Sequence, residues 1–298
     1  IEQSRKDYEA KVKQFGTDGR KEIVGDNYLD INDCKYGNNV LLTADAAVGT
    51  MEAGIIAAKR ENGLGGNGIM DEAEIMTLRV AANGEPYLKD IALAIRYAVD
   101  HDADIIMLPV QNTLYPENQK KWISEALKYA ESKGVFVVTP AWEAAQDLSV
   151  VTYYPNRWMT GERELTNLMV VSSSDKNGNP SMNSNYGAKE IDLYAPGMDI
   201  YSTYTGDTYQ NGTGLGLAAA TTVGVAALIK AYYPHLTGTQ IRNILLETVT
   251  SRKDAEVEKG IVVDGKQTQD LFLFGDLCLS GGIINAYQAV VAADKIAK

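Results

Sequence analysis

Residues 212–234 read GTGLGLAAATTVGVAALIKAYYP, and they overlap the longest uncharged run of the chain, which extends from Thr208 to Ile229. The run has the length of a long helix and lacks a polar face, which predicts a helix buried on all sides inside a large soluble domain. Its length would also suit a membrane span. However, Gly, Ala and Thr dominate the run in place of Leu, Ile and Phe, so membrane insertion would gain little. We therefore expect a core helix and no membrane span.

The overall composition is that of a globular protein. The chain has 298 residues, of which 45% are hydrophobic and 22% are charged, and this length suits one large α/β domain or two small ones. The formal net charge of -11 disfavours nucleic acid and anionic membrane surfaces as partners, because both are themselves negative. The composition instead favours a protein partner of basic or polar character.

Two sequence features bear on the compartment. Cys34 and Cys278 are too few for a disulfide framework and form no paired metal-ligand pattern, although one disulfide between them remains open. The first residues, IEQSRKDYEAKVKQF, are charged and helix-forming, unlike the apolar core of a signal peptide. If the protein is exported, we expect that its signal has already been removed.

Short β-branched runs alternate with amphipathic segments of helical length around the core helix. Strands separated by helices need crossover connections, which predicts a three-layer α/β fold with a mainly parallel sheet between helices. Gly134 is the expected C-cap of one helix and Thr237 the expected N-cap of another, and the polar segment from about 250 to 266 is expected to be a surface excursion. The expected strands are 74–80, 103–110, 135–141, 167–174 and 190–196, and the expected helices are 88–101, 117–134, 237–249 and 282–297.

Three stretches together resemble the subtilase family, the subtilisin-like serine proteases. VGTMEAGIIAAKRENGLGGNGIMDEAEIMTLRV (48–80) resembles the family's His-Gly-Thr-His-Val-Ala-Gly helix with its following loop and strand. SSSDKNGNPSMNSNYGAKEIDLYAPGMDIYST (172–203) resembles its Phe-Ser-Asn-Tyr-Gly and Ala-Pro-Gly segment, and GLGLAAATTVGVAALIKAYYPHLTGTQIRNIL (214–245) resembles its Gly-Thr-Ser-Met-Ala-Ala-Pro helix. The likeness is nearly collinear over 25–297, is similar to subtilases of Bacteroidota, and implies a subtilisin-like fold.

The resemblance allows each catalytic position to be checked in this chain. Val48 stands where the family has its histidine base, and Gly216 stands at the nucleophilic serine, or Gly214 in an alternative registration. Glu143 replaces the oxyanion-hole asparagine, where a carboxylate would repel the developing negative charge. Pro109 lies in the substrate-binding strand and lacks the N–H that a bound peptide would need. The resemblance therefore predicts that all four positions are degenerate and that no catalytic residue remains.

The family's first strand, which carries the catalytic aspartate, has no counterpart before Val48. Residues 1–45 instead resemble a helical insertion and loop found downstream of that strand in some relatives, so we divide the chain into this tail (1–45) and a subtilase-like domain (46–298). Removing a strand from a parallel sheet would expose unpaired backbone groups and part of the core. We expect the strand to come from a missing N-terminal fragment of the same gene product or from a tightly bound protein partner.

Other chemistry finds little support in the sequence. The two histidines, His101 and His235, are expected to be solvated loop residues, while a serine–lysine device is not excluded by composition. The GLGGNG loop (63–68) lacks the βαβ context of a phosphate site. DKNGNP (175–180) lacks the glutamate of a Ca²⁺ loop and predicts a turn. We expect no cofactor and no metal.

These observations lead to one main hypothesis and one alternative. The main hypothesis is a non-catalytic subtilase homologue that is not an enzyme and serves as a protein-binding or structural subunit of an extracytoplasmic complex. Tyrosine-rich segments such as 150–158 and 201–209 suit a protein interface, because aromatic side chains give large contact area at low entropy cost. The alternative is a serine endopeptidase of the subtilase family that is active through an unrecognised or shared site.

Overall fold

A computed structural model of the chain describes residues 20–43, 46–81, 86–110, 116–159, 161 and 163–296. The described helices are α2 (Arg20–Ile23), α3 (Ala47–Ala57), α4 (Leu88–Asp100), α5 (Glu117–Ser132), α6 (Leu215–Tyr232), α7 (Gly238–Glu247) and α8 (Ala286–Ile296), with one short 3₁₀ turn at Phe274–Asp276. The described strands are β1 (Ile105–Met107), β2 (Phe136–Pro140), β3 (Leu168–Ser174), β4 (Leu193–Pro196), β5 (Ile200–Tyr204), β6 (Thr208–Gly212), β7 (Thr250–Ser251), β8 (Glu256–Val263), β9 (Lys266–Leu273) and β10 (Gly282–Ile283).

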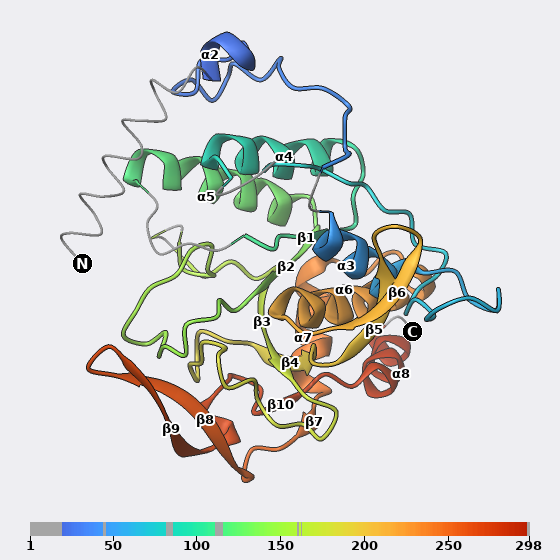
Figure 1. Cartoon of the computed structure of the whole chain (residues 1–298), viewed down its shortest axis with the longest axis vertical. Helices are drawn as coiled ribbons and strands as arrows, with labels where there is room; N and C mark the ends of the chain where they lie inside the picture. The colour runs from blue at the N-terminus through green and yellow to red at the C-terminus, as the bar shows by residue number, and fades with distance from the viewer. Residues whose placement is uncertain are drawn as a thin grey trace.

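Six of these strands form the central sheet, in the order β1-β2-β3-β4-β10-β7. All neighbours pair in parallel except β10 and β7, which pair antiparallel. Figure 1 shows α4 and α5 side by side on one face of the sheet and α3, α6, α7 and α8 on the other. One apolar cluster lies beneath each group of helices. The predicted three-layer α/β fold with a mainly parallel sheet is confirmed.

Most of the uncharged run forms α6, the central helix, while its first residues, Thr208–Gly212, form β6. It packs against β1, β2, β3 and β4 and against α3. Ala218, Ala219 and Ala220 are fully buried, and Gly224 allows Ile69 to approach, since a Cβ there would lie 2.8 Å from the Ile69 Cβ. In the part of the chain that the structure describes, this helix alone is long and apolar enough to cross a membrane, but 61% of it is buried inside the domain. The small residues therefore serve close packing in the core.

The segment that precedes α3 is fastened to α4 by a buried ionic cluster. The Arg20 guanidinium donates to Asp26, with 2.8 Å from Nε to Oδ1, and to Asp90. Lys89 Nζ donates to Asp26 Oδ2 at 2.9 Å, and both Lys89 and Asp26 are buried. Burial alone would raise the pKa of Asp26, but the hydrogen bonds from Arg20 and Lys89 outweigh it and lower that pKa.

Several expectations are confirmed at the level of single elements. The strands predicted at 135–141, 167–174 and 190–196 are β2, β3 and β4, and α4, α5, α7 and α8 lie where helices were predicted. Thr237 is the N-cap of α7 and forms a capping box with Gln240. Gly134 follows the end of α5 with a positive φ of 75°, a conformation that favours glycine. Asp175 accepts backbone N–H groups from Asn177 and Asn179, as expected for a turn.

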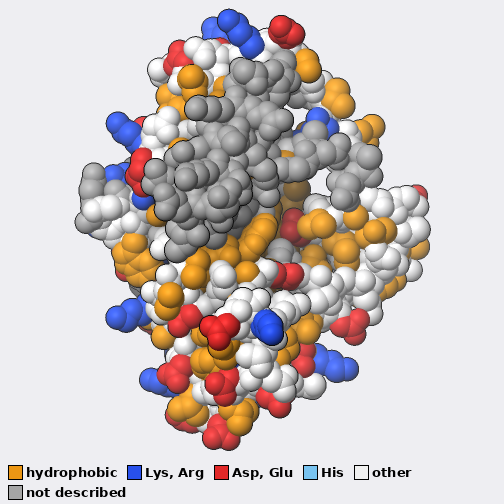
Figure 2. Space-filling view, turned by 60° about the vertical axis from the view of Figure 1, so that its left-hand side comes forward, with side chains coloured by type: hydrophobic (Ala, Val, Ile, Leu, Met, Phe, Trp, Pro, Cys, Tyr) orange, Lys and Arg blue, Asp and Glu red, His pale blue; other side chains and the backbone are white. Residues whose placement is uncertain are grey.

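Other expectations were wrong. Residues 74–80, predicted to be a strand, have no strand pairing, and β1 is shorter than the predicted 103–110. The polar segment from about 250 to 266 is the surface excursion that was expected, since it leads into the mostly exposed β8–β9 hairpin, which projects from the lower end of the molecule in Figure 1; only the hairpin itself was not predicted. A second hairpin, β5–β6, was also missed. Figure 2 shows acidic side chains gathered at that lower end.

Some sequence predictions remain untested by the described structure. The expected N-terminal helix at 1–15 lies outside the described residues, and the division into 1–45 and 46–298 stays a prediction. Cys34 is exposed and Cys278 is buried, and both are free thiols. The disulfide that the sequence left open is therefore not formed.

Candidate functional site

The ends of three parallel strands define one edge of the sheet. Pro109 comes shortly after β1 and Glu143 shortly after β2. Gly197 directly follows β4, and its carbonyl accepts the N–H of Gly214, the N-cap of α6, at 2.9 Å. Because the carboxyl ends of parallel strands meet at one edge, these positions and the N terminus of α6 lie at that edge, where α/β folds commonly place their sites. The residues that the resemblance singled out therefore converge on one region.

Helix α3 is positioned at this edge by the β5–β6 hairpin. The Ser202 Oγ donates to the carbonyl of Met51 at 2.7 Å, and the Thr203 Oγ1 donates to the carbonyl of Thr50 at 2.7 Å. Gly54 makes this approach possible, since a Cβ there would lie 2.1 Å from Thr203 Oγ1. The hydroxyl groups of β5 thus hold the middle of α3 in place.

Glu52 on α3 is the central residue of the candidate site. Its side chain lies against the first turn of α6, since a Cβ on Gly216 would fall 2.1 Å from the Glu52 Oε1. Glu52 is only 7% exposed, and its Oε1 has no hydrogen-bond partner among the described residues. A buried, unpartnered carboxyl group is costly in its charged form. Burial accordingly raises the pKa of Glu52 from 4.5 to about 7.

The surroundings of Glu52 combine two features useful for catalysis. A carboxyl group whose pKa is near 7 can both accept and donate a proton at neutral pH. The first turn of α6 presents backbone N–H groups without intrahelical partners, and the helix dipole favours negative charge there. Val48 lies one turn before Glu52 on the same face of α3 and is 61% exposed. The site therefore runs from solvent at Val48 to a buried carboxyl group at Glu52.

The four predicted site residues lie in different surroundings. Val48 and Gly216 lie on the packed helices α3 and α6, on either side of Glu52 in the site. Glu143 is exposed and forms an isolated antiparallel bridge with Ser184. Pro109 is also exposed, beyond the last residue of β1. That these four positions are degenerate stays a prediction.

Sequence reasoning missed Glu52 itself. The available signal was a single acidic residue inside the otherwise uncharged helix AVGTMEAGIIA. The two histidines lie elsewhere: His101 is exposed and stacks on Tyr97 with 3.8 Å between ring centroids. His235 is exposed in the turn between α6 and α7. Neither belongs to the candidate site.

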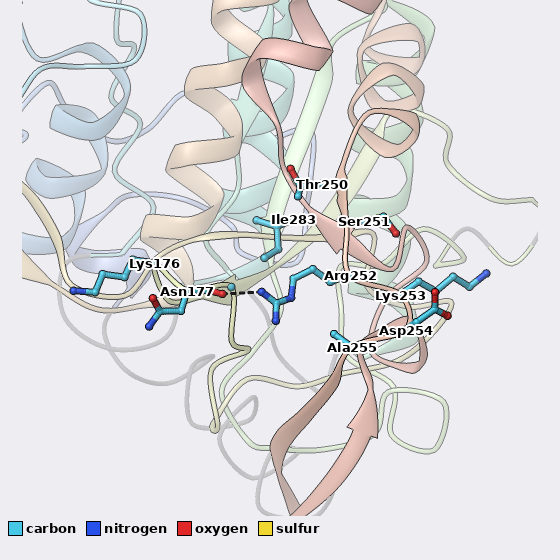
Figure 3. A pocket seen from close by; sticks show the side chains of 10 residues that line it. Lys176, Asn177, Thr250, Ser251, Arg252, Lys253, Asp254, Ala255 and Ile283 are labelled. Carbon is cyan, nitrogen blue, oxygen red and sulfur yellow. Dashed lines mark hydrogen bonds between the residues drawn. The ribbon is translucent and has the colours of Figure 1, made fainter.

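A separate cavity of about 620 Å³ lies on the β10–β7 side of the sheet. Figure 3 shows the Arg252 side chain crossing it toward Asn177, whose carbonyl accepts from Arg252 Nη1 at 2.7 Å. Lys176 and Lys253 point away from this centre in opposite directions. Charged groups do not converge there, so Glu52 remains the better candidate. Across the described ranges, no three His, Cys, Asp or Glu side chains are grouped to hold a metal ion.

Comparison with known proteins identifies the family and supports the fold. The sequence profile of the Subtilase family matches residues 26–264. Subtilisin BL from Lederbergia lenta is 33% identical over 205 residues, which are 68% of this chain and 70% of that protein. A thermostable alkaline protease from Halalkalibacterium halodurans is 31% identical over 223 residues, and the aligned region spans 74% of this chain but only 57% of that relative.

Solved structures agree with the topology. A protease from Pseudoalteromonas arctica PAMC 21717 superposes with a TM-score of 0.63 at 27% identity, covering 88% of this chain and 74% of that one. The prenylagaramide maturation protease PagA superposes with a TM-score of 0.65 at 20% identity, over 84% of both chains, and at that identity the likeness shows the fold alone. The subtilisin-like fold predicted from the resemblance is confirmed, while the likeness to Bacteroidota stays a prediction.

The comparisons correct the prediction that the chain is not an enzyme. Relatives that align with two thirds or more of the chain at 31–33% identity are named as proteases, which points to an enzyme. The prediction of inactivity rests on Val48, Pro109, Glu143 and Gly216 alone. Glu52, which lies against the first turn of α6, is a further titratable group in this region.

Proposed function

The chain belongs to the subtilase family, and from this premise we propose that it hydrolyses peptide bonds at the edge of the sheet where Glu52 meets α6. The observation that carries the proposal is the buried Glu52 side chain, whose Oε1 has no hydrogen-bond partner among the described residues and lies beside the first turn of a long helix. Proteases among the relatives support the reaction class. Extended polypeptides are the proposed substrates.

In the proposed mechanism, Glu52 moves the protons of the reaction. The ionised carboxylate accepts a proton from a water molecule, and the water oxygen attacks the carbonyl carbon of the scissile peptide bond. The N–H groups of the first α6 turn stabilise the negative oxygen that forms. Glu52, now protonated, donates that proton to the leaving nitrogen as the C–N bond breaks. One water molecule is consumed, and a carboxyl group and an amine are released.

The pKa of Glu52 decides when this chemistry is available. Because that pKa is about 7, half of the molecules hold the carboxylate form near neutral pH, and the rate constant kcat/KM should rise as pH increases through 7. Gly216 matters for a steric reason, since any side chain there would compete with the carboxyl group for the same space. The proposal extends to a location outside the cytoplasm, supported by the likeness to subtilisins and tested by fractionation of the producing cells.

The decisive experiment compares the purified chain with Glu52→Gln on fluorescence-quenched peptide libraries and labelled casein. We expect saturable turnover by the unsubstituted chain and loss of at least about 100-fold in Glu52→Gln, the usual range for removing a general base. Glu247→Gln is the matched control, because Glu247 is an exposed carboxylate at the end of α7, outside the candidate site, and its activity should be nearly unchanged. Absence of turnover by the unsubstituted chain on both substrates would refute the proposal.

A fluorophosphonate probe separates the proposed mechanism from the alternative of a serine endopeptidase. The Glu52 mechanism predicts no specific labelling, because no serine is the nucleophile. Labelling of one serine that is blocked by substrate would show that the chain is an enzyme of a different mechanism. Unchanged activity in Glu52→Gln would lead to the same correction.

A further inference from the structure

The β8–β9 hairpin has one face turned to the core and one face turned to solvent. Val257 lies opposite Phe272 in its register, and Glu258 lies opposite Leu271. Residues opposite each other in an antiparallel pair share a face, and Val257 and Phe272 pack in the apolar cluster that contains Phe274. Because successive side chains of a strand point to opposite faces, Glu258 and Leu271 lie on the outer face.

The outer face carries a row of leucines beside a row of carboxylates. Leu271 and Leu273 of β9 are 65% and 47% exposed. Glu258 and Glu256 of β8 are their opposite neighbours and are also exposed. The solvent side of an antiparallel pair is normally polar, so two exposed leucines depart from the usual pattern. We call these four residues the outer hairpin face.

Contacts with the loop between β3 and β4 hold the hairpin in place. Lys259, on the inner face, donates from Nζ to the carbonyls of Met182 at 3.1 Å and Ser184 at 2.6 Å. Nearer the hairpin turn, Gln267 donates to the Asn183 Oδ1 at 2.8 Å. These contacts leave the outer hairpin face, at the other end of the hairpin, exposed. A surface fixed in this way binds a partner at a lower entropy cost than a mobile one.

This end of the molecule is acidic. Two exposed lysines, Lys253 and Lys266, offset only part of its negative charge. Figure 2 shows acidic and hydrophobic side chains together at this lower end. Carboxylates without cationic neighbours attract a basic partner and repel an anionic one. Six exposed carboxylates lie between 254 and 276, and none forms an ion pair with a described residue: Asp254, Glu256, Glu258, Asp264, Asp270 and Asp276.

We propose that the outer hairpin face binds a basic amphipathic helix of a partner protein. Such a helix presents an apolar stripe bordered by Lys or Arg, so its apolar side chains lie on the leucine row while its cations reach the carboxylate row. An extended segment places successive side chains on opposite faces, so neighbouring apolar and basic residues could not both face this surface. Four side chains make a small interface, and the complex is therefore transient. The inference does not depend on the proposed hydrolysis.

The test uses a synthetic probe with defined chemistry. The probe is a fluorescently labelled peptide of Leu and Lys, about 18 residues long so that it can form an isolated helix, with its leucines spaced along one helix face. The control peptide has the same composition with Leu and Lys in strict alternation, which favours a strand. Fluorescence anisotropy measures binding to the unsubstituted chain, and mass spectrometry confirms that both peptides stay intact. We expect the helical probe to bind at least about tenfold more tightly than the alternating control.

Two double variants locate the binding surface. Leu271→Gln with Leu273→Gln removes the leucine row, and Glu256→Gln with Glu258→Gln removes the carboxylate row. Each should weaken binding of the helical probe at least about tenfold. Thermal unfolding shows that both variants are folded, because all four side chains are exposed.

Matched control variants change the same residue types at other exposed positions. They are Leu29→Gln with Leu64→Gln, and Glu72→Gln with Glu74→Gln. Each should change binding less than about twofold at physiological ionic strength, where distant exposed charges are screened. Failure of the helical probe to bind, preference for the alternating peptide, or equal weakening by the control variants would overturn the proposal.

Two other occupants of this face would give different results. Cosedimentation of the chain with vesicles of anionic phospholipid, lost in Leu271→Gln with Leu273→Gln, would assign the face to a membrane surface. A concentration-dependent dimer in analytical ultracentrifugation, lost in the same double variant, would assign it to a second copy of this chain. Either result would overturn the proposal of a basic helix.

Discussion

Replacing Glu52 with glutamine should remove a pH dependence of stability that the buried carboxyl group creates. In the folded chain the pKa of Glu52 is raised from 4.5 to about 7, so between these values the folded state keeps a proton that the unfolded state has lost. The free energy of unfolding therefore falls as the pH rises from about 4.5 to 7, and it stays lower above 7. Glutamine keeps the size of the side chain and cannot ionise.

The size of the effect follows from the same pKa values. A tenfold change in proton affinity corresponds to about 1.4 kcal/mol, so the rise from 4.5 to about 7 corresponds to about 3 kcal/mol. The N terminus of α6 favours the charged carboxylate and opposes part of this cost, by roughly 0.3 to 2 kcal/mol. We expect the unsubstituted chain to lose between about 1 and 3 kcal/mol of stability, relative to Glu52→Gln, between pH 4.5 and 8.

Urea unfolding at a series of pH values from 4.5 to 8, monitored by circular dichroism, measures this difference directly. The control is Glu143→Gln, because Glu143 is exposed at the same edge of the sheet and its removal should leave the pH profile nearly unchanged. If the stability of Glu52→Gln and of the unsubstituted chain changes in parallel over this range, then Glu52 is not a buried acid with a raised pKa. The proposed mechanism would lose its proton carrier as well.

Two further predictions concern buried charges outside the candidate site. Asp192 is fully buried and accepts from Arg157 at 2.7 Å and Arg242 at 2.6 Å. Asp192→Asn leaves these two buried guanidinium groups with only the half-exposed carboxylate of Glu164 and should cost about 3 to 5 kcal/mol in urea unfolding. Glu164→Gln keeps the buried carboxylate of the cluster and should cost less than about 1 kcal/mol. Lys259 is fully buried, and burial lowers its pKa from 10.5 to about 7. Between these pH values the folded state has released a proton that the unfolded state keeps, so the free energy of unfolding should rise with pH from about 7 toward 10. Lys259→Met should flatten this rise and Lys266→Met, on the exposed strand β9, should not; an unchanged slope in Lys259→Met would contradict the lowered pKa of Lys259.

The parts of the fold that the sequence predicted are those fixed by local pattern. The uncharged run became α6 because a helix without a polar face is stable only when buried, and Thr237 capped α7 through its own side chain and that of Gln240. These signals lie within one element. They need no knowledge of what the element packs against.

The β8–β9 hairpin shows where local pattern was insufficient. Its turn carries the usual signal, since Asp264 and Gly265 both have positive φ values of 50° and 74°, as a two-residue hairpin turn requires. Strand β9 is almost wholly exposed, and β8 alternates between exposed and buried positions only from Glu256 to Lys259, so the alternation that marks a half-buried sheet is too short to predict the hairpin. The strand prediction at 74–80 was wrong for the opposite reason: the segment has the composition of a strand, but no described strand lies beside it to pair with.

Glu52 was missed because its role arises only from tertiary packing. In the sequence it is one charge within an apolar helix, and nothing local distinguishes a solvated glutamate from a buried one. The structure shows that it faces Gly216, a residue far away in the chain. The family resemblance compares Gly216 only with the expected serine. Which side chain lies beside Gly216 depends on how α3 packs against α6, and this packing is not visible in the sequence.

Gly216 and Glu52 are in close contact between α6 and α3. A Cβ at 216 would lie 2.1 Å from Glu52 Oε1, too close for any side chain unless the carboxyl group moves. A side chain at 216 would therefore displace the Glu52 carboxyl group from its position in this structure. The Glu52 carboxyl group thus lies beside the N terminus of α6, where negative charge is favoured, and its raised pKa of about 7 gives this region a group that titrates near neutral pH.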